Sequence, residues 1–229
     1  MEDGRMKKWK VQITGDNIDL RRIMNCFPEG ETHVQELEKE FFILSDSFES
    51  LSSHHEVNVE VTSILGIWNP LVSLQWPGFG FVKSDVVIET HEDGKTTRYH
   101  SGFCAFNIRS NVDVRLDAAG QETRSQSVIR KMNGNQKKEL VLKLWGHPNR
   151  SWTQLYRMVE EMEAEVGCLA SAGIATKSEL KRFKNSANSA AVAGLDARHR
   201  SQFDAPSNPM TLGEADELLR HVALKFLNL

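Results

Sequence analysis

Polar side chains able to bind an anion or to move a proton gather in one stretch near the C-terminal end of the sequence. Asn188, Asp196, Arg198 and His199 lie in a polar segment between two predicted helices. Arg and His side chains bind phosphate or hydroxyl groups, and Asn and Asp can orient them. We take these four residues as the candidate binding site. The alternative, which we favour, is an ordered loop in which Arg and Asn side chains satisfy the carbonyl and amide groups at helix ends.

Two other patterns could support chemistry, and neither is convincing. His54 and His55 precede Glu56, but adjacent side chains on a helix point about 100° apart, and no further ligand follows at metal-site spacing. The segment Gly78–Gly80 resembles a phosphate-binding glycine loop. A phosphate loop leads into a helix N-terminus, whereas a predicted strand follows here, so we expect a turn that begins the sheet.

The sequence contains no phosphate-binding P-loop, nucleophile elbow, HExxH or paired CxxC motif. We therefore predict no catalytic residue, no metal site and no cofactor.

Composition indicates an ordinary globular protein. The chain has 229 residues, of which 40% are hydrophobic and 26% charged, with a formal net charge of −3. This excludes collagen-like and fully disordered chains, and no apolar run is long enough to cross a membrane. The three cysteines are odd in number and widely spaced, and no secretory signal is visible at the N-terminus. We therefore expect a cytoplasmic protein that does not bind a membrane.

The helices and strands expected from the sequence indicate an α+β protein. It has a mixed α/β N-terminal region with an antiparallel sheet, followed by a helical C-terminal domain. We place the α+β domain at residues 1–120, a basic connector at 121–150 and the helical domain at 151–229. Leu140, Val141, Leu144 and Trp145 sit on one possible helix face, so the connector can still contain helical pieces. The elements expected in the first domain are, in order, a strand at 9–13, a helix at 18–27, a strand at 41–44, a hairpin of strands 82–90 and 96–108, and a strand at 111–116.

Residues 53–72 fit two patterns. Alternation at Val57, Val59 and Val61 suits a strand, whereas the longer apolar register has helical spacing. Ser53 and Glu56 form a capping box at its start, which favours the helix. We expect that helix to end at Pro70.

The C-terminal domain is the clearest part of the sequence. Three capping boxes precede helical periodicity: Ser151 with Gln154, Thr176 with Glu179, and Thr211 with Glu214. The helices that follow Ser151 and Thr211 must bury their apolar stripes together, so we predict one core that both share. Its expected members are Trp152, Leu155, Val159, Leu218, Leu219, Val222 and Phe226.

The closing pattern, with Asn-Ser-Ala-Asn from Asn185, Ala-Arg-His from Ala197 and the last amphipathic helix, resembles the C-terminal part of uncharacterised bacterial proteins. The arrangement is also loosely similar to HEPN domains, small helical domains that often act as ribonucleases in toxin and anti-phage systems. That likeness covers about the last third of the chain. HEPN ribonucleases place an Arg and a His on one helix with four to six residues between them, whereas Arg198 and His199 are adjacent. The resemblance therefore implies the fold but carries over no catalytic residue.

Charge is unevenly distributed. Residues 29–60 are strongly acidic, whereas residues 124–143 carry six basic side chains and one acidic one. Both can be solvated faces, and both can steer partners. We predict a non-enzymatic binding or regulatory protein of the bacterial cytoplasm that recognises a protein partner. The alternative is a HEPN-like ribonuclease in which Arg124–Lys143 tracks a nucleic acid backbone.

Overall fold

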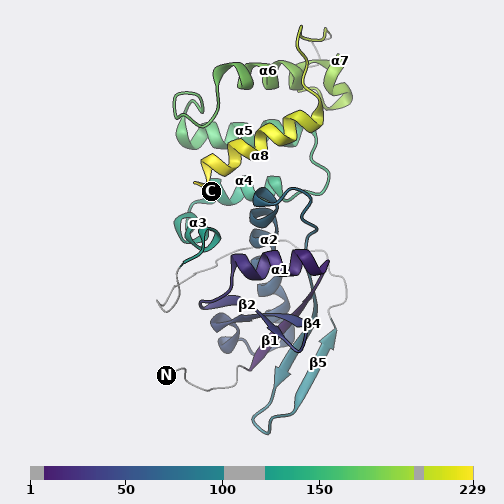
Figure 1. The fold of residues 1–229 in the computed structure, drawn as a ribbon, viewed down its shortest axis with the longest axis vertical. Helices are drawn as coiled ribbons and strands as arrows, with labels where there is room; N and C mark the ends of the chain where they lie inside the picture. Colours follow the sequence, from purple (N-terminus) through teal and green to yellow (C-terminus); the bar gives the residue numbers. More distant parts are fainter. Residues whose placement is uncertain (1–7, 101–121, 199–203, 229) are drawn as a thin grey trace. The chain divides into compact units, whose positions relative to one another are not determined.

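The computed structural model describes residues 8–100, 122–198 and 204–228 (Figure 1). The predicted strand at 111–116, the second half of the predicted strand 96–108 and the candidate residue His199 lie outside these ranges. The chain divides into two compact units, Met1–Asn133 and Gly134–Leu229. The first unit contains an antiparallel sheet with helices and the second is helical, so the predicted α+β class is confirmed.

The N-terminal unit contains one five-stranded antiparallel sheet. The elements follow in the order β1 (Trp9–Thr14), α1 (Asn17–Cys26), β2 (Thr32–Leu37), β3 (Glu40–Ser45), α2 (His54–Gln75), β4 (Lys83–Thr90) and β5 (Thr96–His100), with a 3-10 turn at Asp46–Ser50. The strand order is β2-β3-β1-β4-β5. The first four strands and two helices therefore have the connectivity of the ferredoxin-like split β-α-β motif, to which the β4–β5 hairpin adds an edge strand.

The face of the sheet that meets the helices carries the main core of this unit. Val11, Ile43 and Val87 are cross-strand partners and are almost completely buried. The two helices also pack on each other, because the ring of Phe27, which follows α1, stacks on Trp68 of α2 at 3.9 Å between centroids. The positions of both helices on the sheet are thus fixed by aromatic and β-branched side chains.

Helix α2 begins as predicted and ends later than predicted. Ser53 and Glu56 form the capping box. Pro70 does not end the helix, which continues to Gln75. A proline inside a helix costs about 3 kcal/mol. The residues after it, Leu71 and Leu74, are 0% exposed, and their burial offsets that cost because each fully buried leucine contributes about 1.5–3 kcal/mol.

The basic segment predicted as a connector is largely helical. It contains α3 (Arg124–Met132) and α4 (Gln136–Trp145), and the division between the two units falls between them. Helix α3 is anchored to the N-terminal unit, since Thr123 Oγ1 donates to the carbonyl of Cys26 at 2.5 Å. The segment also buries more apolar side chains than its polar composition led us to expect: Val128, Ile129, Met132, Val141, Leu142 and Trp145.

The helical unit contains α4, α5 (Trp152–Val166), α6 (Lys177–Asn188), the short α7 (Ala190–Ala193), a 3-10 turn at Gly194–Asp196 and α8 (Leu212–Phe226). The helix starts at Thr176 and Thr211 carry the predicted capping boxes, and Gln154 Oε1 accepts the N–H of Ser151. Leu218 is partly exposed, but the other predicted core residues are buried: Trp152, Leu155, Val159, Leu219, Val222 and Phe226. In the described parts of the chain, no helix is both long and apolar enough to cross a membrane.

Candidate functional site

The predicted polar site lies at the end of α6 and in the turn that follows it. The backbone N–H of Arg198 donates to the carbonyl of Ala187 at 3.2 Å, which folds this turn back against α6. Asn188 is the last residue of α6 and Asp196 the last of the 3-10 turn.

The side chain of Arg198 is held on helix α5. Its guanidinium lies 2.7 Å from a carboxylate oxygen of Glu160 and 4.4 Å from the ring centroid of Tyr156. Tyr156 and Glu160 are four residues apart and share one face of α5. The ion pair is about half exposed, so its electrostatic contribution is small, about 0–1 kcal/mol. The Arg198 side chain therefore fastens the turn to the side of α5, whereas its backbone N–H meets the end of α6.

The other predicted site residues do not join Arg198. Asp196 is exposed, and its backbone carbonyl accepts a hydrogen bond from Thr153 Oγ1 at 3.2 Å. Asn188 Oδ1 is buried and has no hydrogen-bond partner within the described part of the chain. Between these two residues, Leu195 is 100% exposed at the tip of the turn. The described members of the predicted site thus face different surroundings.

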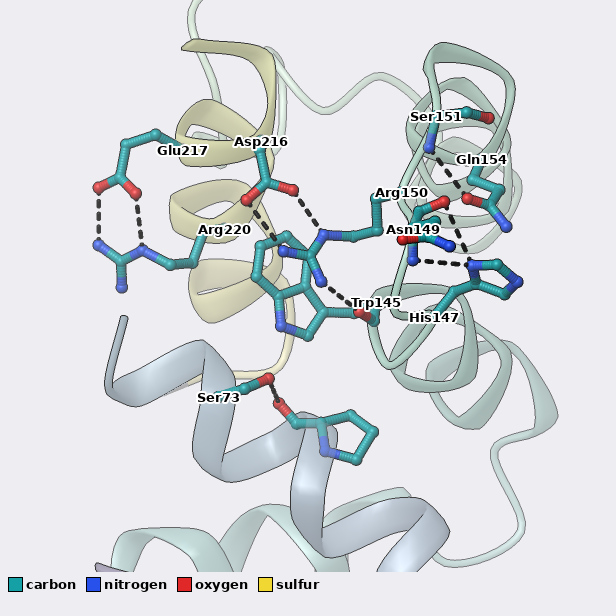
Figure 2. A network of polar contacts seen from close by, with 11 residues as sticks. Ser73, Trp145, His147, Asn149, Arg150, Ser151, Gln154, Asp216, Glu217 and Arg220 are labelled. Carbon is teal, nitrogen blue, oxygen red and sulfur yellow. Dashed lines mark hydrogen bonds and ion pairs between the residues drawn. The ribbon is translucent and has the colours of Figure 1, made fainter. Parts of the chain in front are cut away.

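Arg150 has the helix-end role that we expected of Arg198. Its Nη1 donates to the carbonyl of Trp145, the last residue of α4, at 2.9 Å (Figure 2). Nε and Nη2 donate to the two carboxylate oxygens of Asp216 on α8 at 2.5 and 3.0 Å. The guanidinium also lies 4.1 Å from the centroid of the buried Trp145 ring. A planar, two-pronged donor is required for these contacts, so lysine could not replace it.

Arg182 makes a second clamp of the same kind. It donates to the backbone carbonyls of Asn208 and Pro209 and to the carboxylate of Glu214 at 2.9 Å. The Thr211 N–H and Arg182 both donate to this carboxylate and lower the pKa of Glu214 to about 2. The start of α8 is thereby tied to α6.

Three of the six basic side chains in segment 124–143 make contacts within the chain. Arg130 pairs with Glu122 at 3.0 Å, and Lys143 pairs with Glu139 at 3.7 Å. Lys137 donates to the carbonyl of Ala164. These basic side chains are committed to contacts within their own units.

No group of three or more His, Cys, Asp or Glu side chains is placed to hold a metal ion in residues 8–100, 122–198 and 204–228. Burial raises the pKa of the Cys26 thiol to about 11, so this thiol is a poor nucleophile near neutral pH.

An apolar surface that the sequence did not reveal lies at the end of the sheet in the N-terminal unit. Ile18, in the first turn of α1, is 63% exposed, and Phe81, in the loop that leads from α2 into β4, is 38% exposed. Phe81 lies beside the buried ring of Phe79, with 6.2 Å between centroids. Gly78 and Gly80 in the same loop are also exposed. We call these four exposed residues, Ile18, Gly78, Gly80 and Phe81, the Ile18–Phe81 surface.

Two buried polar side chains hold this surface in place. Asp19 Oδ2 accepts the N–H of Gly80 at 2.8 Å, while its Oδ1 accepts from Arg22. Asn69 on α2 donates to the carbonyl of Val82 at 2.9 Å and accepts its N–H at 3.0 Å. Because Ile18 and Phe81 are the sequence neighbours of the bonded pair Asp19 and Gly80, their backbones are held close together.

The close approach of this loop to α1 explains why residue 80 is a glycine. A Cβ atom at position 80 would lie 3.1 Å from Asp19 Oδ2, closer than ordinary van der Waals contact. Gly80 therefore allows the loop to approach α1. The segment Gly78–Gly80 is the predicted turn at the start of the sheet. The N–H groups of Phe79 and Gly80 donate to the carbonyl of Trp76 and to the carboxylate of Asp19.

Comparison of the chain with protein-family models, with curated proteins and with solved structures gives no significant match. The HEPN resemblance stays a prediction.

Proposed function

We propose that this chain is a non-catalytic binding protein of the bacterial cytoplasm and that its Ile18–Phe81 surface recognises a protein partner. The observation that carries the proposal is an exposed Ile in the first turn of α1 and an exposed Phe on the loop that buried Asp19 and Asn69 hold in place. Apolar and aromatic side chains that are already rigid bind with little loss of conformational entropy. Such anchors supply most of the energy of protein interfaces.

Energetics support a binding role for this loop. A buried polar group is costly unless it is bonded, and Asp19 and Asn69 are only 5% and 6% exposed. Their bonds go to the backbone of Gly80 and Val82, on either side of Phe81. The buried polar groups thus define the position of an exposed aromatic ring. A loop that only joined α2 to β4 would not require an exposed Phe.

The ribonuclease alternative has less support. The Arg198 guanidinium is paired with Glu160, and the basic side chains of segment 124–143 divide between α3 and α4. Nucleic acid backbones are bound by cations that exchange counterions for phosphates. Here Arg130, Lys137 and Lys143 contact groups of the chain itself.

Site-specific photo-crosslinking in the host cell tests the proposal. A benzophenone side chain at position 81 is expected to give a discrete protein adduct, identified by mass spectrometry. The matched control is position 59, since Val59 is 44% exposed on α2. Adducts of equal yield from positions 81 and 59 would remove the support for this surface.

A further inference from the structure

We propose that Asn133 is a site of spontaneous covalent modification, at which the backbone nitrogen of Gly134 attacks the Asn133 side chain and converts it into an acid. This inference is independent of the proposed function. Asn133 and Gly134 form the single Asn-Gly pair of the sequence. They lie in the short connection between α3 and α4, at the point where the two compact units divide.

Three features of this connection favour the attack. Both residues are exposed to water. The N–H of Gly134 donates no hydrogen bond to any residue that the structure describes, so this nitrogen is not already engaged. Gly134 has φ +78°, and a Cβ atom built there would meet nothing within 4 Å. A glycine in open space offers the least steric resistance to a side chain that approaches its nitrogen.

The attack requires one rotation of the backbone. Asn133 has ψ 119°, and the nitrogen of Gly134 reaches the side-chain carbon Cγ only after rotation about the Cα–C bond of Asn133. Inside a helix such a rotation is blocked, because the dihedral angles are fixed and the N–H groups are bonded. Asn133 follows the last residue of α3 and is already outside the helical range of ψ. Gly134 can compensate for the rotation, since glycine adopts both signs of φ.

The reaction has two steps, and the second consumes water. In the first, a bond forms between Gly134 N and Asn133 Cγ while the Cγ–Nδ2 bond breaks. The Nδ2 group leaves as ammonia and takes the proton of the Gly134 N–H, which leaves a five-membered cyclic imide. Water then adds to one of the two imide carbonyls. Attack at Cγ gives aspartate, whereas attack at the main-chain carbon gives isoaspartate, in which the backbone runs through the side chain.

Both products change the end of α3. Each adds a negative charge beside the C-terminal end of this helix, which the helix dipole disfavours. Isoaspartate also adds one carbon atom to the backbone of the connection. The link between α3 and α4 is thereby altered as the chain ages, without an enzyme.

Peptide mass mapping of the whole purified chain, incubated at mildly alkaline pH, tests the proposal. The matched internal control is Asn185, which is also exposed but lies inside α6, where the N–H of the next residue is bonded to the helix backbone. Asn133 is expected to convert about tenfold faster than Asn185 or more. The product should contain both aspartate and isoaspartate, which labelling by an isoaspartyl methyltransferase distinguishes.

Asn133→Gln provides the second test. Its longer side chain cannot close the five-membered ring, so conversion at position 133 should fall to the level of the Asn185 control. Equal rates at Asn133 and Asn185 in the wild type would overturn the proposal. Conversion of Asn133 to aspartate alone would also overturn it, because opening of the cyclic imide gives both products.

Discussion

The carboxylate of Asp19 accepts the backbone N–H of Gly80 at 2.8 Å, although the two residues are 61 positions apart in the sequence. This bond joins the first turn of α1 to the loop that follows α2. It joins the backbones of α1 and this loop next to Ile18 and Phe81, the two exposed apolar residues of the Ile18–Phe81 surface.

Removal of the Asp19 carboxylate should loosen this loop. Asp19→Ala leaves the Gly80 N–H and the Arg22 guanidinium without their acceptor, and we expect a loss of about 1–3 kcal/mol in the free energy of unfolding. Asp19→Asn keeps one acceptor oxygen and should lose less. Urea unfolding of both variants measures the difference, and equal losses would show that the acceptor is not what matters.

Arg150 and Arg198 should differ in their importance for stability. Arg150→Ala removes hydrogen bonds to Asp216 and to the Trp145 carbonyl, and should cost about 1.5–3 kcal/mol. Arg198→Ala removes a half-exposed ion pair and a ring contact, and should cost about 0–1 kcal/mol. Thermal unfolding of the two variants beside wild type tests this order. A larger loss for Arg198→Ala would restore the helix-end role predicted for it.

Acid should weaken the attachment of α8. The pKa of Glu214 is lowered to about 2, so this carboxylate stabilises the fold above its unfolded-state pKa of about 4.5. That contribution is lost as the pH falls from about 4.5 toward 2. Glu214→Gln retains an oxygen for the Thr211 N–H but cannot titrate. Its unfolding midpoint should therefore depend less on pH than that of the wild type in this window, and parallel curves would contradict the assignment.

Two adjacent leucines of α8 provide a matched test of the helical core. Leu219 is 0% exposed, whereas Leu218 is partly exposed. Leu219→Ala should cost about 2–5 kcal/mol, the range for a buried leucine. Leu218→Ala should cost clearly less. Chemical denaturation distinguishes them, and similar losses would mean that the stripe of α8 is packed differently.

Helix starts were predicted well where a short sequence motif marks them. The capping boxes at Ser53, Thr176 and Thr211 each begin a helix. The same signal at Thr123 and Gln126 also begins α3, although its polar sequence led us to predict a connector. Attention to that pair would have located α3. Strand β2 has no clear alternation of apolar and polar residues, so its pairing with β3 could not be predicted from local pattern.

The candidate surface could not be predicted because it depends on contacts between distant residues. Ile18 is the first residue of the helix predicted at 18–27, yet it lies outside the core and is 63% exposed. Nothing local indicates that Asp19 faces Gly80, or that Asn69 bonds to Val82. Likewise, the sequence indicated that an arginine would satisfy a helix end but not that it would be Arg150. Such choices depend on tertiary packing.

The most direct test of the central claim is the photo-crosslinking yield from position 81, measured with and without Ile18→Asp in the same chain. If the Ile18–Phe81 surface binds a protein, the adduct should decrease about tenfold or more in the Ile18→Asp background, because the two residues share one interface. The level and melting temperature of the chain should not change. An adduct of undiminished yield would contradict the claim that these residues form a single protein-binding surface.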